Sequence, residues 1–256
     1  MSALLEVRNL SRHYGDRIGC EQIDFDVHPG ELLCIVGESG SGKSTLLNTV
    51  AGQLAPTMGS MRYRQRDGGW LDLHDLSEAD RRRLSREEWG FVTQNPRDGL
   101  RLNVSAGANV AERLMALGSR HYGQLRDTAM QWLERVEIDP ARIDDAPSSF
   151  SGGMQQRLQI ARTLVTQPRL VFMDEPTAGL DVSVQARILD LLRRLVGELG
   201  LAAVMVTHDL AVARLLAART MVMQRGRVVE TGLTDQILDD PQHPYTQLLV
   251  SSVLTT

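Results

Sequence analysis

Apolar residues come in short runs through the first part of the chain, and polar or turn-forming residues separate the runs. This pattern predicts strands over residues 4–10, around 23–27 and over 32–36. From Lys43 the apolar positions recur at helical spacing, so a helix is expected directly after a glycine-rich loop. The chain thus begins with strand, loop and helix in succession.

The pattern becomes polar and helical between about residues 77 and 137. Apolar residues lie at helical spacing in segments such as 106–117 and 125–136, and strand signals are few. We therefore expect a helical subdomain at about residues 95–168, inserted into the core of a single domain that covers residues 1–256.

Two further units of strand followed by helix come after this region. Their predicted strands cover 170–173 and 201–206, and their predicted helices cover 184–199 and 210–218. Alternation of this kind predicts a parallel sheet covered by helices, with ligand chemistry at the carboxyl ends of the strands.

The tail is expected to add strands at 220–224 and 227–231 and a helical extension at about 233–256. No internal repeat or low-complexity segment is found. The proportions of hydrophobic residues, 42%, and charged residues, 23%, are those of an ordinary folded protein. A chain of 256 residues can also bury a sizeable core.

The net charge and the absence of targeting patterns mainly show which functions and locations are not expected. The formal net charge of -4 provides no basic field, so no binding to nucleic acid is expected. The N-terminus lacks a signal pattern, and the apolar run 201–206 is far shorter than the roughly 20 residues of a membrane span. We expect a cytoplasmic protein that contacts membranes only through a partner. Cys20 and Cys34 do not form a metal cluster pattern, and Cys34 is expected in the core.

A phosphate-loop pattern lies between the third predicted strand and the helix. It consists of Gly37, Glu38, Ser39, Gly40, Ser41, Gly42, Lys43 and Ser44, and we include the next residue, Thr45, in the predicted nucleotide site. Its glycines let several backbone amides and the positive end of the helix converge on phosphates. Lys43 would reach the terminal phosphates, and Ser44 would bind magnesium. The alternative is a flexible turn, which the full pattern in this context disfavours.

A second motif is the predicted strand at 170–173 that runs into two acids, Asp174 and Glu175. A buried strand fixes the position of its end, so Asp174 could hold the magnesium shell while Glu175 acts as general base on the attacking water. Acids are common at strand ends, and the motif gains its meaning from the phosphate loop.

A third motif is Ser151-Gly152-Gly153, which opens a helix with periodic apolar positions. Serine at a helix start is an ordinary cap. Two glycines directly after it weaken the first turn, however. They are expected if a phosphate must approach bare backbone at the positive end of the helix dipole.

Together these motifs resemble those of the ATP-binding-cassette ATPases, and the likeness covers nearly the whole chain. It implies an α/β fold, a P-loop nucleotide-binding domain with a parallel-sheet core, an antiparallel β subdomain and a helical insertion. It also implies Mg²⁺-dependent hydrolysis of ATP by a head-to-tail homodimer, in which Ser151, Gly152 and Gly153 seal the nucleotide on the partner's phosphate loop. Phe150 and Met154 differ from the family's Leu and Gln, which affects the packing around the motif.

Four further positions match the family one at a time. The resemblance implies that Tyr14 stacks on adenine, that Gln94 senses magnesium and the attacking water, and that His208 contacts the terminal phosphate. Asp181 matches the loop that contacts the opposite protomer. A single tyrosine can equally be a surface residue and a single histidine a structural one, but His208 follows a predicted strand at its carboxyl end.

The choice of partner stays open between two resemblances. Residues 243–249 resemble the end of the peptide and nickel importer ATPases, which would imply membrane permease subunits. Segments at 88–90, 98–101, 104–107, 120–123, 142–145 and 150–165 resemble the ATP-binding subunits of the bacterial carbon-phosphorus lyase systems. That resemblance implies phosphonate catabolism and a homodimer docked on soluble lyase core subunits through a face at 96–109. A nucleotide-gated scaffold with little turnover is the third hypothesis.

Overall fold

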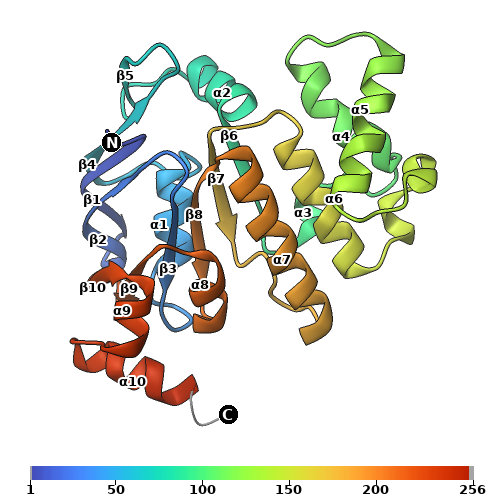
Figure 1. Cartoon of the computed structure of the whole chain (residues 1–256). Helices are drawn as coiled ribbons and strands as arrows, with labels where there is room; N and C mark the ends of the chain where they lie inside the picture. Colours follow the sequence, from blue (N-terminus) through green and yellow to red (C-terminus); the bar gives the residue numbers. More distant parts are fainter. Residues whose placement is uncertain (1, 254–256) are drawn as a thin grey trace. The chain divides into compact units, whose positions relative to one another are not determined.

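The computed structural model describes residues 2–253, and the contacts within the chain divide it into two compact units. The first unit combines residues 1–81 with 196–256, and the second comprises residues 82–195. Both boundaries fall inside helices, α2 (Glu78–Glu87) and α7 (Val182–Leu199), which Figure 1 labels.

An antiparallel sheet forms the beginning of the first unit. Its strand order is β2-β1-β4-β5. The strands are β1 (Leu5–Tyr14), β2 (Arg17–Val27), β4 (Met58–Arg64) and β5 (Trp70–Asp72). Along β1 the fully buried side chains Leu5, Val7 and Leu10 belong to the core, whereas most polar residues between them face outward. This sheet is the antiparallel β subdomain that the family resemblance implies.

The first unit also contains strands β3 (Leu32–Val36), β8 (Ala202–Thr207), β9 (Arg219–Gln224) and β10 (Arg227–Leu233). Strand β3 pairs in parallel with β8 on one side and β9 on the other, and β10 adds to β9 in antiparallel orientation. Every side chain of β3 and β8 is buried, as is typical of parallel strands covered on both faces. Cys34 is fully buried here, as predicted.

Four helices complete the first unit. They are α1 (Lys43–Val50), α8 (Leu210–Leu216), α9 (Thr234–Asp239) and α10 (Pro244–Val253). Helix α1 buries Leu46, Leu47 and Val50, the positions whose helical spacing predicts it.

The second unit combines a parallel strand pair with a group of helices. The strands are β6 (Trp89–Val92) and β7 (Leu170–Asp174), and the rings of Trp89 and Phe172 pack in a T-shaped arrangement with 5.2 Å between their centroids. The other elements are α3 (Pro96–Gly99), α4 (Ala106–Ala116), α5 (Tyr122–Arg135), η1 (Pro140–Asp144), η2 (Pro147–Ser149), α6 (Gly152–Leu164) and α7.

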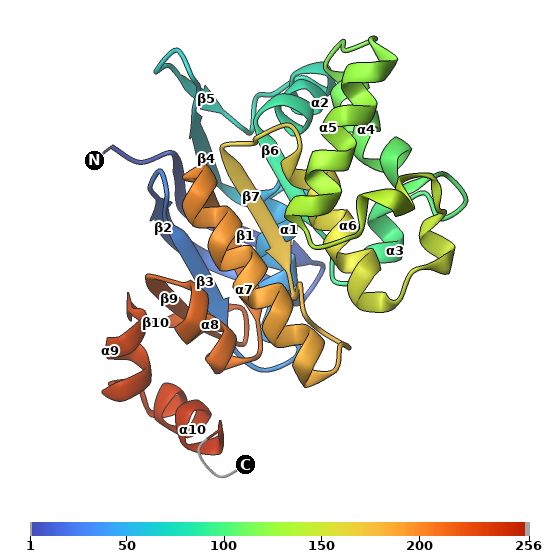
Figure 2. The same ribbon diagram turned by 45° about the vertical axis from the view of Figure 1, so that its right-hand side comes forward.

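Helices α4, α5 and α6 pack on one another, and Figure 2 shows them side by side. Each begins at a residue whose side chain accepts a hydrogen bond from a backbone amide of the first turn. These caps are Ser105, His121 and Ser151. Polar residues therefore fix where the helices start, and the apolar faces fix how they pack.

Most predicted elements are present, and the differences have local causes. Strands β4 and β5 were not predicted, because arginines and glycines interrupt their apolar pattern and most of their side chains are exposed or half-buried. The helix predicted at 210–218 ends at Leu216. Within residues 2–253 no helix combines the length and apolar character needed to cross a membrane.

Candidate functional site

The phosphate loop leaves the buried end of β3 and runs into α1. At Gly37 and Gly42 the backbone φ angles are 151° and 103°, values that favour glycine. A Cβ atom at Gly37 would collide with the carbonyl oxygen of Met223 in β9, and one at Gly42 with that of Gly19 in β2. The loop therefore packs against two strands through backbone alone.

Lys43 lies inside the curve of this loop, with its side chain only 4% exposed. Its Nζ donates hydrogen bonds to the carbonyl oxygens of Gly37 at 2.8 Å and Glu38 at 2.9 Å. The hydroxyl of Ser41 is buried and has no hydrogen-bond partner within the described part of the chain. A buried hydroxyl without a partner is costly. A cationic loop with such an unpartnered hydroxyl fits the phosphates of a nucleotide.

His208 belongs to the same edge of the sheet in the first unit. Val36 of β3 pairs in parallel with Thr207 of β8, so Gly37 and His208 each follow a paired residue. The Thr207 hydroxyl accepts a hydrogen bond from the Asp209 amide at 3.1 Å. His208 itself has an exposed side chain. The sheet register thus brings the phosphate loop and the predicted histidine to neighbouring strand ends.

Tyr14 ends β1 and is 44% exposed. The guanidinium of Arg12 lies 4.7 Å from the centroid of its ring. An added Cβ at Gly19 would be 2.9 Å from Tyr14 Cε2 and 2.7 Å from Thr45 Cγ2. The edge of the tyrosine ring therefore lies near the end of the phosphate loop, where an adenine could stack on it.

The two acids and Gln94 lie at the strand ends of the second unit. Val92 of β6 pairs in parallel with Met173 of β7, so Gln94 and Asp174 both come just after this pair. Glu175 follows with a φ of 42°, which turns the chain sharply out of the strand. A non-glycine residue in this left-handed region is strained, as residues of functional sites often are. Its side chain is half-buried.

The predicted trans motif opens α6, also in the second unit. Ser151 accepts a hydrogen bond from the Met154 amide at 3.3 Å and thus caps the helix. A Cβ at Gly153 would collide with Val184 of α7, whereas one at Gly152 would meet only Leu180 Cδ2 at 3.6 Å. Packing within the chain therefore requires Gly153, but it does not require Gly152, which is exposed.

Asp181 is exposed just before α7 and is held by short-range hydrogen bonds. Its Oδ1 accepts from the Val184 amide at 3.0 Å and from the Ser183 hydroxyl at 2.8 Å. The amide of Val184 is the largest cause of a lowered pKa for Asp181, followed by the Ser183 hydroxyl. The residue therefore presents a charged carboxylate at neutral pH.

The structure adds one contact of the phosphate loop that the sequence did not reveal. The hydroxyl of Tyr245 in α10 accepts a hydrogen bond from the backbone amide of Glu38 at 3.1 Å. Glu38 and Tyr245 are far apart along the chain, so the sequence does not predict that they meet. The motif at 243–249 that contains Tyr245 is the one sequence feature that draws attention to this residue.

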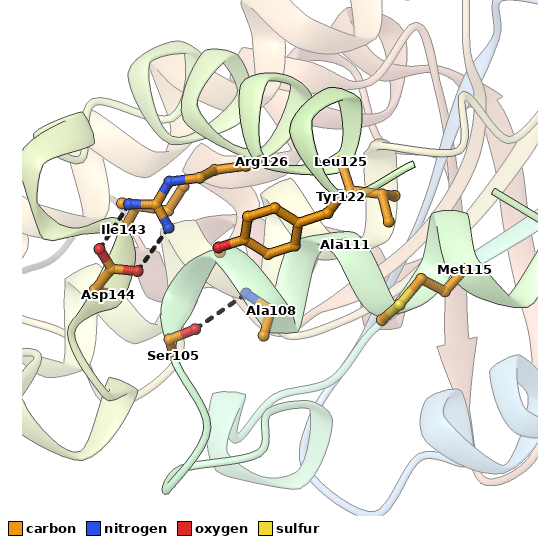
Figure 3. A pocket seen from close by; sticks show the side chains of 10 residues that line it. Ser105, Ala108, Ala111, Met115, Tyr122, Leu125, Arg126, Ile143 and Asp144 are labelled. Atoms are coloured by element: carbon orange, nitrogen blue, oxygen red, sulfur yellow. Dashed lines mark hydrogen bonds and ion pairs between the residues drawn. The ribbon is translucent and has the colours of Figure 1, made fainter. Parts of the chain in front are cut away.

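A pocket of about 160 Å³ lies between α4, α5 and η1 in the second unit (Figure 3). Small and apolar side chains such as Ala108, Ala111 and Met115 line it. Arg126 and Asp144 form an ion pair at one end, with two contacts of 2.7 Å and 2.6 Å. The sequence did not predict this pocket. Some of the residues that line the pocket belong to the expected partner face at 96–109.

Comparison with known proteins identifies the class. The family described as ABC transporter matches residues 20–178, and the family described as oligopeptide/dipeptide transporter, C-terminal region, matches residues 229–256. The chain belongs to the ABC transporter ATPases and is an ATP-hydrolysing enzyme. The family resemblance and the fold class expected from the sequence are thereby confirmed.

Two relatives and two solved structures define the similarity more closely. The chain is 65% identical to the phosphonates utilization ATP-binding protein PhnK of Escherichia coli, over 98% of both chains. It is 38% identical to the dipeptide transport ATP-binding protein DppF of the same organism, over 97% of this chain and 76% of the relative.

The ATP-binding cassette MJ0796, in a dimeric post-hydrolysis state bound to ADP and Pi, is 29% identical with a TM-score of 0.78, covering 90% of this chain and 98% of that one. The structure of CbiO1 from Clostridium perfringens, part of the ABC transporter complex CbiONQ, is 29% identical with a TM-score of 0.80. That match covers 94% of this chain and 92% of the other.

The contrast between the two glycines of the trans motif can be tested by unfolding. We expect Gly153→Ala to lower the free energy of unfolding by about 1–3 kcal/mol, because the added methyl group overpacks the contact with Val184. Gly152→Ala should not lower it and can raise it by up to about 1 kcal/mol, because alanine favours the first helical turn more than glycine does. Urea titrations followed by circular dichroism measure both values. The double variant with Val184→Ala should recover most of the loss, and equal losses in the two single variants would contradict the packing argument.

Proposed function

We propose that the chain is the ATP-binding subunit of a carbon-phosphorus lyase complex in phosphonate catabolism, and that two copies paired head to tail hydrolyse Mg-ATP between them. The observation that carries this proposal is the 65% identity with PhnK over 98% of both chains, since that relative is named for phosphonates utilization. The cassette match over residues 20–178 supports the nucleotide chemistry.

The loop from Gly37 to Thr45 would hold the phosphates of ATP. Its support is the buried ammonium of Lys43 and the unpartnered hydroxyl of Ser41. The Ser41 hydroxyl would gain a partner, and the Lys43 ammonium would gain a negative charge to balance its own, when phosphate oxygens enter the loop. Tyr14 would stack on the adenine, and His208, which follows the strand paired with β3, would contact the terminal phosphate.

Ser44, Gln94 and Asp174 would hold Mg²⁺ together with oxygens of the nucleotide. Hydroxyl, amide and carboxylate oxygens are the ligands that this ion prefers, and it commonly takes only one or two carboxylates from the protein. Within the described residues no group of three or more His, Cys, Asp or Glu side chains could hold a metal by itself. When bound, the ion would neutralise charge on the phosphates as the bond between them breaks.

Glu175 would accept the proton of the attacking water. Strand β7 is buried up to Met173, so the position of the carboxylate that follows is fixed by packing of residues such as Phe172. The left-handed backbone of Glu175 turns the chain out of the strand at this residue. The presence of Glu175 and His208 disfavours the alternative of a scaffold with little turnover, because a scaffold does not require them.

The start of α6 would close over the nucleotide of the second copy. Gly152 is exposed and its lack of a side chain is not required by packing within the chain. A phosphate could therefore approach its backbone amide at the positive end of the helix dipole. The similar cassette MJ0796 in its dimeric state with ADP and Pi supports this pairing.

The partner is proposed to be the soluble lyase core, reached through the inserted helical subdomain at about residues 95–168. The pocket beside the face at 96–109 offers an apolar recess for a partner side chain. In this assignment the protein is cytoplasmic. The second candidate is an importer motor that binds membrane permease subunits, and the match of residues 229–256 to the transporter C-terminal family favours it.

Replacing Glu175 by Gln tests the assignment of the general base. We expect turnover to fall by at least about 100-fold, because general-base catalysis typically contributes that much or more. The affinity for ATP should stay unchanged, since the phosphate loop is intact. Phosphate release and equilibrium nucleotide binding are the measurements. Glu87→Gln, the same change at an exposed position of α2, is the matched control, and undiminished hydrolysis in Glu175→Gln would refute the role.

Replacing Ser151 by Arg tests the trans site. The larger side chain should block pairing around ATP while each copy still binds nucleotide on its own phosphate loop. Size-exclusion chromatography with ATP, in the Glu175→Gln background, measures the dimer. Ser151→Ala removes the helix cap and one hydroxyl of the trans site but adds no bulk, so it should weaken pairing far less and still dimerise. A Ser151→Arg protein that dimerises like the Ala variant would contradict the model.

Co-purification tests the partner. Tagged protein expressed at native level and purified without detergent should bring down soluble lyase subunits. Ala108→Trp, which fills the pocket, should reduce this recovery without changing nucleotide affinity. Ala116→Trp places the same side chain on an exposed position of α4 outside the pocket and serves as control. Recovery of hydrophobic membrane subunits alone would instead assign the chain to an importer.

A further inference from the structure

The C-terminal motif at residues 243–249 has no part in the chemistry described so far, yet its first turn is tightly fixed within the first unit. The carboxylate of Glu230 in β10 accepts hydrogen bonds from the backbone amides of Gln242 at 2.8 Å and His243 at 3.0 Å. His243 Nδ1 in turn accepts from the amide of Tyr245 at 3.2 Å. The beginning of α10 is therefore tied to a strand of the sheet.

Tyr245 projects from this fixed turn to the phosphate loop. It is 7% exposed, and its hydroxyl accepts the hydrogen bond from the Glu38 amide at 3.1 Å. Burial raises the pKa of Tyr245, and although the Glu38 amide opposes the shift, the Glu38 carboxylate adds to it. The phenol thus stays protonated, so it can donate to this carboxylate while it accepts from the amide.

The carbonyl oxygen of Glu38 is held by two further hydrogen bonds within the phosphate loop. It accepts hydrogen bonds from Lys43 Nζ at 2.9 Å and from the Ser41 amide at 3.2 Å. Tyr245 therefore fixes the amide of the same residue whose carbonyl orients the lysine. Loss of the Tyr245 hydroxyl would therefore alter the position of Glu38, and through Glu38 that of the Lys43 ammonium.

We propose that Tyr245 is a positioning residue, which holds the phosphate loop in the conformation that receives the nucleotide. The inference rests on the proposed role of this loop in binding phosphates. Without the phenol hydroxyl, Glu38 would lose a fixed partner, and the loop would have to be ordered when the nucleotide binds. Ordering at that moment weakens binding. In a merely structural role, Tyr245 would anchor α10 and affect stability alone.

The test compares Tyr245→Phe with the unchanged chain in equilibrium binding of ATP and ADP. The variant keeps the ring and removes one oxygen, and we expect the Kd for both nucleotides to rise about fivefold, the scale of one net hydrogen bond. Amide hydrogen exchange at Glu38 should become faster in the nucleotide-free variant. Tyr63→Phe, which removes a buried hydroxyl in β4 of the same unit, should leave both quantities unchanged.

Lys43→Ala separates this inference from the proposed function. If Lys43→Ala weakens nucleotide binding strongly and Tyr245→Phe leaves the Kd and the exchange of Glu38 unchanged, the positioning role is wrong and the phosphate loop stands. If Lys43→Ala itself leaves binding unchanged, the role of the loop is wrong. A lower melting temperature for Tyr245→Phe with unaltered Kd would assign the residue to anchoring α10 and would also overturn the inference.

Discussion

The burial of β3 between two parallel neighbours is the constraint on which the phosphate loop depends. Because β8 and β9 pair with both edges of the strand and every side chain of β3 is buried, the point where the loop begins cannot shift. From that point, backbone contacts with β9 and β2 determine the curve of the loop. The curve then sets Lys43 against carbonyl oxygens of Gly37 and Glu38. The position of one charged group thus follows from apolar packing.

In the second unit, too, buried parallel strands fix the position of the polar residues that follow them. Strand β7 pairs with β6, and the contact between Phe172 and Trp89 fixes the two strands side by side. Asp174 and Glu175 follow the buried Met173, and Gln94 lies two residues after the buried Val92, so these polar side chains can leave the core. In both units, the predicted site residues lie where parallel strands end, as is general for sheets of this kind.

Sequence reasoning could predict the elements and residues that carry a strong local pattern. Strand β3, the loop after it and the acids after β7 follow from apolar runs and glycine spacing. It could not predict β4, whose arginines and glycine hide the alternation of Met61 and Tyr63. It also missed the contact of Tyr245 with Glu38, since only the folded chain brings the two together. Gly153 was expected to serve a ligand, and the structure gives it a packing reason.

The glycines of the chain differ in whether a second substitution could make room for a side chain at their position. At Gly37 and Gly42 the obstacle to a side chain is a backbone oxygen, which no second substitution elsewhere can shorten or remove. At Gly153 the obstacle is the side chain of Val184, which can itself be exchanged. Among homologous sequences, position 153 can therefore covary with position 184, whereas positions 37 and 42 have no residue with which to compensate.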